Sequence, residues 1–204
     1  IGAEIGAVTE DRGAGISGLS GVTAEDVPLH VTVTDEDTGT VKNGNVRMID
    51  DESLLPTLTA TSIYNFVSRT MNRGGEGTVS LSYTLWPEDV SQKPFTRQNM
   101  YWSDTGIAER SVDEIYNVTE ALEQNRFLPY KLRSITVDAE LTKDRETAQL
   151  LDATATPAVV SPGDRIYIRV RLQPYRGEIF TKEMIFTVPK DQALGDMYLE
   201  LRGG

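Results

Sequence analysis

The stretch Val79-Ser-Leu-Ser-Tyr-Thr-Leu-Trp86 alternates apolar residues with three hydroxylated ones and a tryptophan. A period of two is typical of a β-strand that buries one face and leaves the other in water. Pro87 follows directly, and since proline has no backbone N–H to donate to a neighbouring strand, we expect the strand to end there. Residues 79–86 therefore predict a half-buried strand.

Similar alternation recurs on both sides of this stretch and predicts a β-rich chain. It is cleanest in residues 165–172, where four branched apolar residues alternate with Arg165, Tyr167, Arg169 and Arg171. The other predicted strands cover residues 29–34, 41–48, 95–102, 135–141, 148–160, 183–188 and 197–201.

Two segments have the spacing of helices instead. Apolar residues from Leu54 to Met71 recur at helical intervals. Ser111 and Glu114 have the spacing of a capping box, and an apolar stripe follows them to about Asn125, so we expect the second helix to begin at Ser111.

These patterns predict the α+β fold class and two domains. Residues 1–129 form an α+β segment in which two main helices pack on antiparallel strands, and residues 130–204 form an immunoglobulin-like β-sandwich. The boundary is soft, because residues 126–130 lack the composition of a flexible linker, and the two parts could pack as one unit.

Composition narrows the function. The chain of 204 residues has 20 Lys and Arg against 31 Asp and Glu, a net charge of −11, which disfavours nucleic acid as a partner. It has no cysteine, so disulfides, thiol nucleophiles and cysteine zinc sites are excluded. No run approaches the ~20 apolar residues of a membrane span. We expect no cofactor.

Candidate catalytic and metal-binding groups are few. The sole histidine, His30, alternates with Leu29 and Val31, so we expect it on the polar face of a strand rather than in a catalytic site. Asp35 and Asp37 resemble the start of a calcium loop, but Val46 stands where the loop needs a bidentate carboxylate. We predict neither a catalytic residue nor a metal site.

The arginine-rich strand has two interpretations. Arg165, Tyr167, Arg169 and Arg171 share one face and form a candidate surface patch for an anion or a polysaccharide. Alternatively, the arginines form a cross-strand charge ladder with acids such as Asp138 and Glu140. The ladder is the favoured interpretation.

Asp11 and Arg12 are the other residues singled out. They lie in the run from Ile5 to Gly18, where a strand-like segment breaks into a glycine-rich turn. Arginine offers a fixed fork of donors that can bind backbone carbonyls or a carboxylate. We expect Asp11 and Arg12 to act as a structural clamp or as an interaction site.

The run from Ile5 to Gly18 resembles a segment that lies downstream of the catalytic core in long SpoIVB-type serine peptidases. The residues 97–103, 125–127, 162–164 and 174–178 are similar to later phrases of that family, in the same order. The family's nucleophile phrase, Gly-Met-Ser-Gly-Ser-Pro, is absent, since residues 15–21 lack its proline.

The resemblance implies a non-catalytic accessory or interaction region of an exported bacterial protein. Its partner would be the upstream peptidase core of the same polypeptide or another envelope protein, and its location extracytoplasmic. On this interpretation the chain is a fragment of a longer protein. Two alternatives stay open: a divergent peptidase that uses Ser17 or Ser20, and a carbohydrate-binding sandwich that uses Tyr167, Trp86 or Trp102.

Overall fold

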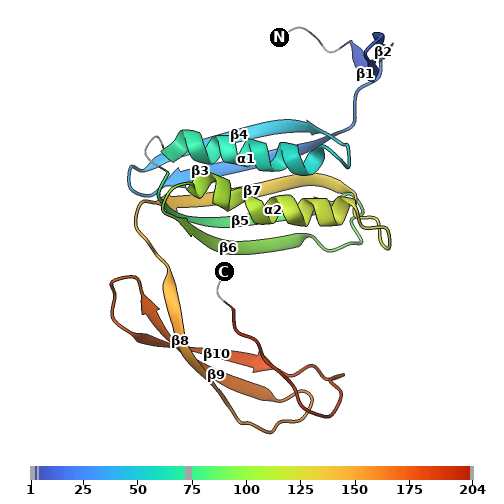
Figure 1. The fold of residues 1–204 in the computed structure, drawn as a ribbon. Coiled ribbons are helices and arrows are strands. Elements are labelled where there is room, and N and C mark those ends of the chain that lie inside the picture. The colour runs from blue at the N-terminus through green and yellow to red at the C-terminus, as the bar shows by residue number, and fades with distance from the viewer. Residues whose placement is uncertain (1–2, 4, 72–74, 203–204) are drawn as a thin grey trace. The chain divides into compact units, whose positions relative to one another are not determined.

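The computed structural model describes residues 3, 5–71 and 75–202. The chain divides into two compact units, Ile1–Lys143 and Asp144–Gly204. As the alternating patterns predict, the described residues are rich in strands and contain two helices (Figure 1). The elements are β1 Gly6–Arg12, β2 Gly15–Ser20, β3 Asp26–Asp35, β4 Thr40–Ile49, α1 Leu55–Met71, β5 Gly77–Pro87, β6 Phe95–Ser103, α2 Ile107–Glu123, β7 Leu132–Thr142, β8 Ala148–Thr156, β9 Arg165–Pro174 and β10 Phe180–Thr187.

The first unit is built on a five-stranded sheet with the order β4-β3-β7-β5-β6. β7 runs antiparallel to β5 but parallel to β3, so the prediction of antiparallel strands alone is wrong for this sheet. The physical reason is the connection: the chain leaves β6, forms α2 and returns to the middle of the sheet, which two-residue hairpins cannot accomplish.

Both helices cover one face of this sheet, and Figure 1 shows them side by side on it. The side chains beneath them come from the odd-numbered residues of the three inner strands and are almost fully buried, as the period-two pattern requires. They are Val27, Leu29, Val31 and Val33 of β3, Val79, Leu81, Tyr83 and Leu85 of β5, and Ile135, Val137, Ala139 and Leu141 of β7. The helices add Leu55, Ile63, Val67 and Ile115.

The boundary between the units differs from the expected division at residues 129 and 130, because β7 is the middle strand of the first sheet. The loop before β7 is fastened by Tyr130. Its hydroxyl lies 2.9 Å from the Lys93 carbonyl and 3.2 Å from the Leu85 carbonyl, and it accepts a hydrogen bond from the Phe95 amide. The loop therefore packs on the sheet and is not a linker.

The start of α2 corrects a second expectation. The helix begins at Ile107. In the loop before it, Ser103 Oγ accepts a hydrogen bond from the Gly106 amide at 2.9 Å. Ser111 lies inside the helix, where its hydroxyl donates to the Ala108 carbonyl at 2.8 Å. Ser111 and Glu114 therefore do not form a capping box, because Glu114 binds residues of β6 instead.

The second unit holds a three-stranded antiparallel sheet with the order β10-β9-β8. Ile166, Ile168 and Val170 of β9 form its small core with Val188. The predicted strand at 197–201 is wrong: the segment is irregular, although Met197 and Leu201 pack against the core. The described residues of this unit contain one sheet.

The buried side of α1 gives a test of this packing. Ile63 is fully buried, so Ile63→Ala removes apolar contacts and leaves a cavity that α1 cannot close without shifting. We expect a loss of about 2–5 kcal/mol in the free energy of unfolding, measured by urea denaturation. Ser68→Ala, on the exposed side of the same helix, is the matched control, and an equal loss in both variants would contradict this packing.

Candidate functional site

The exposed face of β9 combines charged, aromatic and hydroxyl side chains. Arg165, Tyr167, Arg169 and Arg171 point to this face, because the residues between them point into the core. Their cross-strand neighbours are Thr156, Thr154 and Asp152 on β8, and Thr187, Ile185, Glu183 and Thr181 on β10. The part of this surface that holds Thr154, Thr156, Tyr167, Arg169 and Glu183 is called the Tyr167 face below.

Two of the arginines form ion pairs with the neighbouring strands. Arg169 Nη2 lies 3.0 Å from Glu183 Oε1, and Arg171 Nη1 lies 2.8 Å from Asp152 Oδ2. A charge ladder is therefore present, but Asp138 and Glu140 are not its acids, since both belong to β7 in the first unit. Carboxylates neutralise Arg169 and Arg171, so at these two residues the contacts favour the charge ladder over an anion site.

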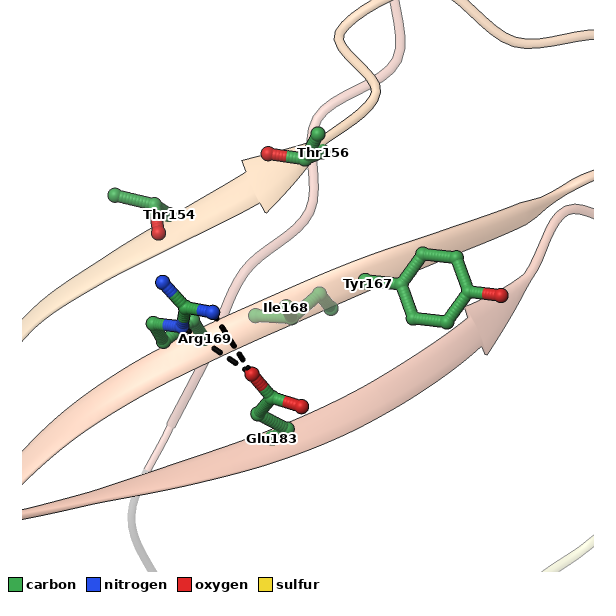
Figure 2. A pocket seen from close by; sticks show the side chains of 6 residues that line it. All are labelled: Thr154, Thr156, Tyr167, Ile168, Arg169 and Glu183. Atoms are coloured by element: carbon green, nitrogen blue, oxygen red, sulfur yellow. Dashed lines mark hydrogen bonds and ion pairs between the residues drawn. The ribbon is translucent and has the colours of Figure 1, made fainter.

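A half-open cavity of about 360 Å³ lies on the Tyr167 face. Figure 2 shows its lining: Thr154 and Thr156 on β8, the Tyr167 ring on β9, and the Arg169–Glu183 pair. Tyr167 is 55% exposed. The cavity thus combines an aromatic surface with hydroxyl groups, guanidinium donors and a carboxylate acceptor within one small area.

Asp11 and Arg12 are exposed, which does not fit the expected clamp that fixes the glycine-rich turn to the rest of the domain. They lie on β1, which pairs with β2 in a separate two-stranded sheet, and the Arg12 side chain is 74% exposed. Its guanidinium binds Glu10 Oε1 at 3.1 Å, on the same strand. Salt bridges of this exposed kind contribute little stability, so the clamp has little support and the interaction site stays a prediction.

The imidazole of His30 and the hydroxyl of Ser20 make structural contacts. His30 Nδ1 lies 2.6 Å from Asn45 Oδ1 across β3 and β4, and both residues are exposed. Ser20 Oγ donates to the Ile5 carbonyl at 3.2 Å within the β1–β2 hairpin. Neither contact is the Ser–His pair that would activate a nucleophile.

The aspartates that resemble a calcium loop tie a turn to β7. Asp35 Oδ1 accepts from the Asp37 amide at 3.0 Å, and Asp37 Oδ2 accepts from the Lys143 amide at 2.7 Å. Among the described residues, no group of three or more His, Asp or Glu side chains is arranged to bind a metal ion. The carboxylates of this turn serve as hydrogen-bond acceptors for backbone groups.

A cluster around Glu114 joins α2 to β6, and sequence reasoning missed it. The Glu114 carboxylate accepts hydrogen bonds from Arg97 Nε at 2.5 Å, from Asn99 Nδ2 at 3.0 Å and from the Tyr101 hydroxyl. Burial alone would raise the pKa of Glu114, but hydrogen bonds from Tyr101, Asn99 and Arg97 hold it below its ordinary value. The carboxylate is therefore ionised at neutral pH.

The Tyr83 hydroxyl lies near this cluster and is buried without a hydrogen-bond partner among the described residues. Burial, with a contribution from the Glu114 charge, raises the pKa of Tyr83 to about 12. Burial also raises the pKa of Tyr101, as do its hydrogen bond to Glu114 and the Glu114 charge. Both phenols stay neutral, so the cluster is a fixed structural connection between helix and sheet.

Lys131 is surrounded by carboxylates from several elements. Its Nζ lies 2.9 Å from Glu25, 3.3 Å from Asp50 and 3.8 Å from Glu88. Hydrogen bonds to Glu25 and Asp50 raise the pKa of Lys131, so the side chain stays protonated. Burial and the charge of Asp50 raise the pKa of Glu123 nearby. A protonated, paired lysine cannot act as a general base.

Comparisons with protein-family models, with curated proteins and with solved structures find no match to this chain. Within the described residues, neither helix is long and apolar enough to cross a membrane.

The Glu114 cluster predicts a pH-dependent part of the stability. Because the folded state lowers the pKa of Glu114 below its ordinary value of 4.5, this stability is present above that pH and is lost as the pH falls through the folded value. Glu114→Gln should lose roughly 1–3 kcal/mol at pH 7 and show a shallower decline in acid, in urea denaturation at several pH values.

Glu109→Gln, on the exposed side of α2, is the control and should retain the wild-type pH profile. Identical acid profiles for wild type and Glu114→Gln would show that the carboxylate does not stabilise the fold.

Proposed function

We propose that the chain is a non-catalytic interaction module that binds glycans through the Tyr167 face. The observation that carries this proposal is the exposed Tyr167 ring beside the Arg169–Glu183 pair and the two threonines of β8. The proposal builds on the carbohydrate-binding alternative and on the absence, in the described contacts, of an activated nucleophile.

Glycans suit this surface on chemical grounds. A sugar ring has an apolar face of C–H groups that can stack on an aromatic ring, as other apolar surfaces do. Its hydroxyls donate and accept, which matches a surface that offers guanidinium donors, carboxylate acceptors and threonine hydroxyls together. A cavity of about 360 Å³ falls within the range of small-molecule sites.

The resemblance to SpoIVB-type peptidases supports a wider proposal about context. The chain would be an accessory region downstream of a peptidase core, outside the cytoplasm, with that core or another envelope protein as its partner. The exposed hairpin with Asp11 and Arg12 would be a contact point for this partner. An immunoglobulin-like sandwich is the corresponding proposal for the second unit, in which β8, β9 and β10 would supply one sheet.

Glycan binding is tested by isothermal titration calorimetry with cellohexaose, xylohexaose and N-acetylchitohexaose. Tyr167→Ala removes the ring and should weaken binding of the recognised sugar about tenfold or more, as the loss of one aromatic contact predicts. Tyr167→Phe keeps the ring and should bind nearly as well. Tyr198→Ala is the matched control, since Tyr198 is 92% exposed in the same unit but does not line the cavity.

The non-catalytic part of the proposal predicts that the purified chain neither cleaves casein nor reacts with a fluorophosphonate serine probe, because among the described residues neither Ser17 nor Ser20 is hydrogen-bonded to a histidine or lysine side chain. Mass spectrometry of the treated protein measures the outcome. Labelling that disappears in the Ser17→Ala and Ser20→Ala variants would instead establish the divergent-peptidase alternative.

A further inference from the structure

The uncovered face of the five-stranded sheet is a second surface, distinct from the Tyr167 face. Since both helices pack on the other side, the even-numbered residues of β3, β5 and β7 point to this uncovered face. One cross-strand row runs over all five strands as Asn45, His30, Thr136, Thr84 and Thr96. At about 4.8 Å between strands, this row is roughly 19 Å wide.

The composition of this face is unlike that of the chain as a whole. One quarter of the residues of the chain are charged. In this row and in the two rows that follow it toward Trp102, those of Ser82 and Ser80, the charged residues are Asp138 and Glu140, both on β7. The remaining members are mostly Ser, Thr, Asn and Gln. Depletion of charge is typical of recognition surfaces rather than of ordinary solvated ones.

Both tryptophans of the chain, Trp86 and Trp102, belong to this face. Trp86 follows Leu85, which is buried under the helices, and Trp102 follows Tyr101, which binds Glu114 of α2. Trp102 pairs with Thr78, eight residues before Trp86 on β5, so the two residues stand at opposite ends of the strand pair, with roughly 27 Å of strand between these positions.

The indole of Trp86 is held in place by the sheet. Its Nε1 donates to Thr136 Oγ1 at 3.2 Å, which fixes the ring beside β7, and the residue remains 36% exposed. Thr84 and Thr96 are hydrogen-bonded to each other at 3.2 Å in the same region. A ring that is already held in position loses little conformational entropy when a ligand stacks on it.

We propose that this face binds an extended neutral glycan along β5 and β7, with a tryptophan at each end. Ser80, Ser82 and Thr84 of β5 line the path between the two indoles and can each donate and accept. Asp138 and Glu140 beside them accept from sugar hydroxyls. The proposal stands on different residues from the Tyr167 face, so either can fail alone.

Charge selects the class of ligand. The three rows between the tryptophans contain two exposed carboxylates and no lysine or arginine, and Arg47, near the Trp86 end, is paired with Asp26. Uronic-acid polymers, phosphorylated glycans and nucleic acids are therefore repelled. A neutral polyhydroxylated chain avoids this repulsion and still satisfies the carboxylates as hydrogen-bond acceptors. Neutral glycans are therefore favoured over anionic ones.

Intrinsic tryptophan fluorescence tests this proposal, because every tryptophan of the chain lies on this face. Neutral cellohexaose or N-acetylchitohexaose should change the emission saturably, while hexagalacturonate at the same concentration should not. The Asp138→Asn, Glu140→Gln double variant keeps the shape but removes the charged acceptors, and should weaken neutral binding about tenfold. The matched control is Glu109→Gln, Asp113→Asn on α2, which should bind as wild type.

The Tyr167→Ala variant separates the two proposals. Its fluorescence titration should match that of wild type even if calorimetry shows that glycan binding at the Tyr167 face is lost. An emission unchanged by both neutral hexasaccharides would overturn the proposal, as would equal binding of hexagalacturonate. Emission that depends on protein concentration, without glycan, would show that a second copy of the chain covers the face, and would overturn it as well.

Discussion

The position of β7 is the constraint on which the first unit depends. It lies between β3 and β5, so the two halves of the sheet are joined only through a strand that follows β5, β6 and α2 in the chain. Its inward side chains, from Ile135 to Leu141, are nearly inaccessible to solvent. Burial of apolar surface stabilises a fold by about 25 cal/mol per Å², so the burial of these side chains is a main source of stability for the unit.

The alternating pattern of β7 and its two neighbours explains why both helices lie on one side of the sheet. Since the odd-numbered residues of β3, β5 and β7 are the apolar ones, only one face can supply a core for α1 and α2. Glu114 then fixes α2 against β6 through three donors. The opposite face carries mostly hydroxyl and amide side chains in the rows from Thr84 to Ser80, and these are the groups that the proposed glycan would contact.

Sequence patterns predicted the individual strands well, because alternation is a local property of residues such as those from Val79 to Trp86. They did not predict the parallel pairing of β3 with β7, which depends on the path of the chain between them. Ser111 and Glu114 matched a capping box, yet contact with Tyr101 outweighed that local preference. The ladder on β9 was anticipated, but its acids depended on strand order, which spacing does not encode.

The five-stranded and the three-stranded sheets share one physical arrangement that bears on the proposed function. In each, covering a single face leaves the other polar, and an antiparallel pair then brings side chains from neighbouring strands into register at about 5 Å. Tyr167 beside Arg169 and Glu183, and Trp86 beside Thr136, are products of that register rather than of nearby sequence. Because a sheet holds such groups rigidly, they would contact a ligand with little loss of side-chain freedom. Binding through sheet faces thus needs neither a deep cleft nor a metal.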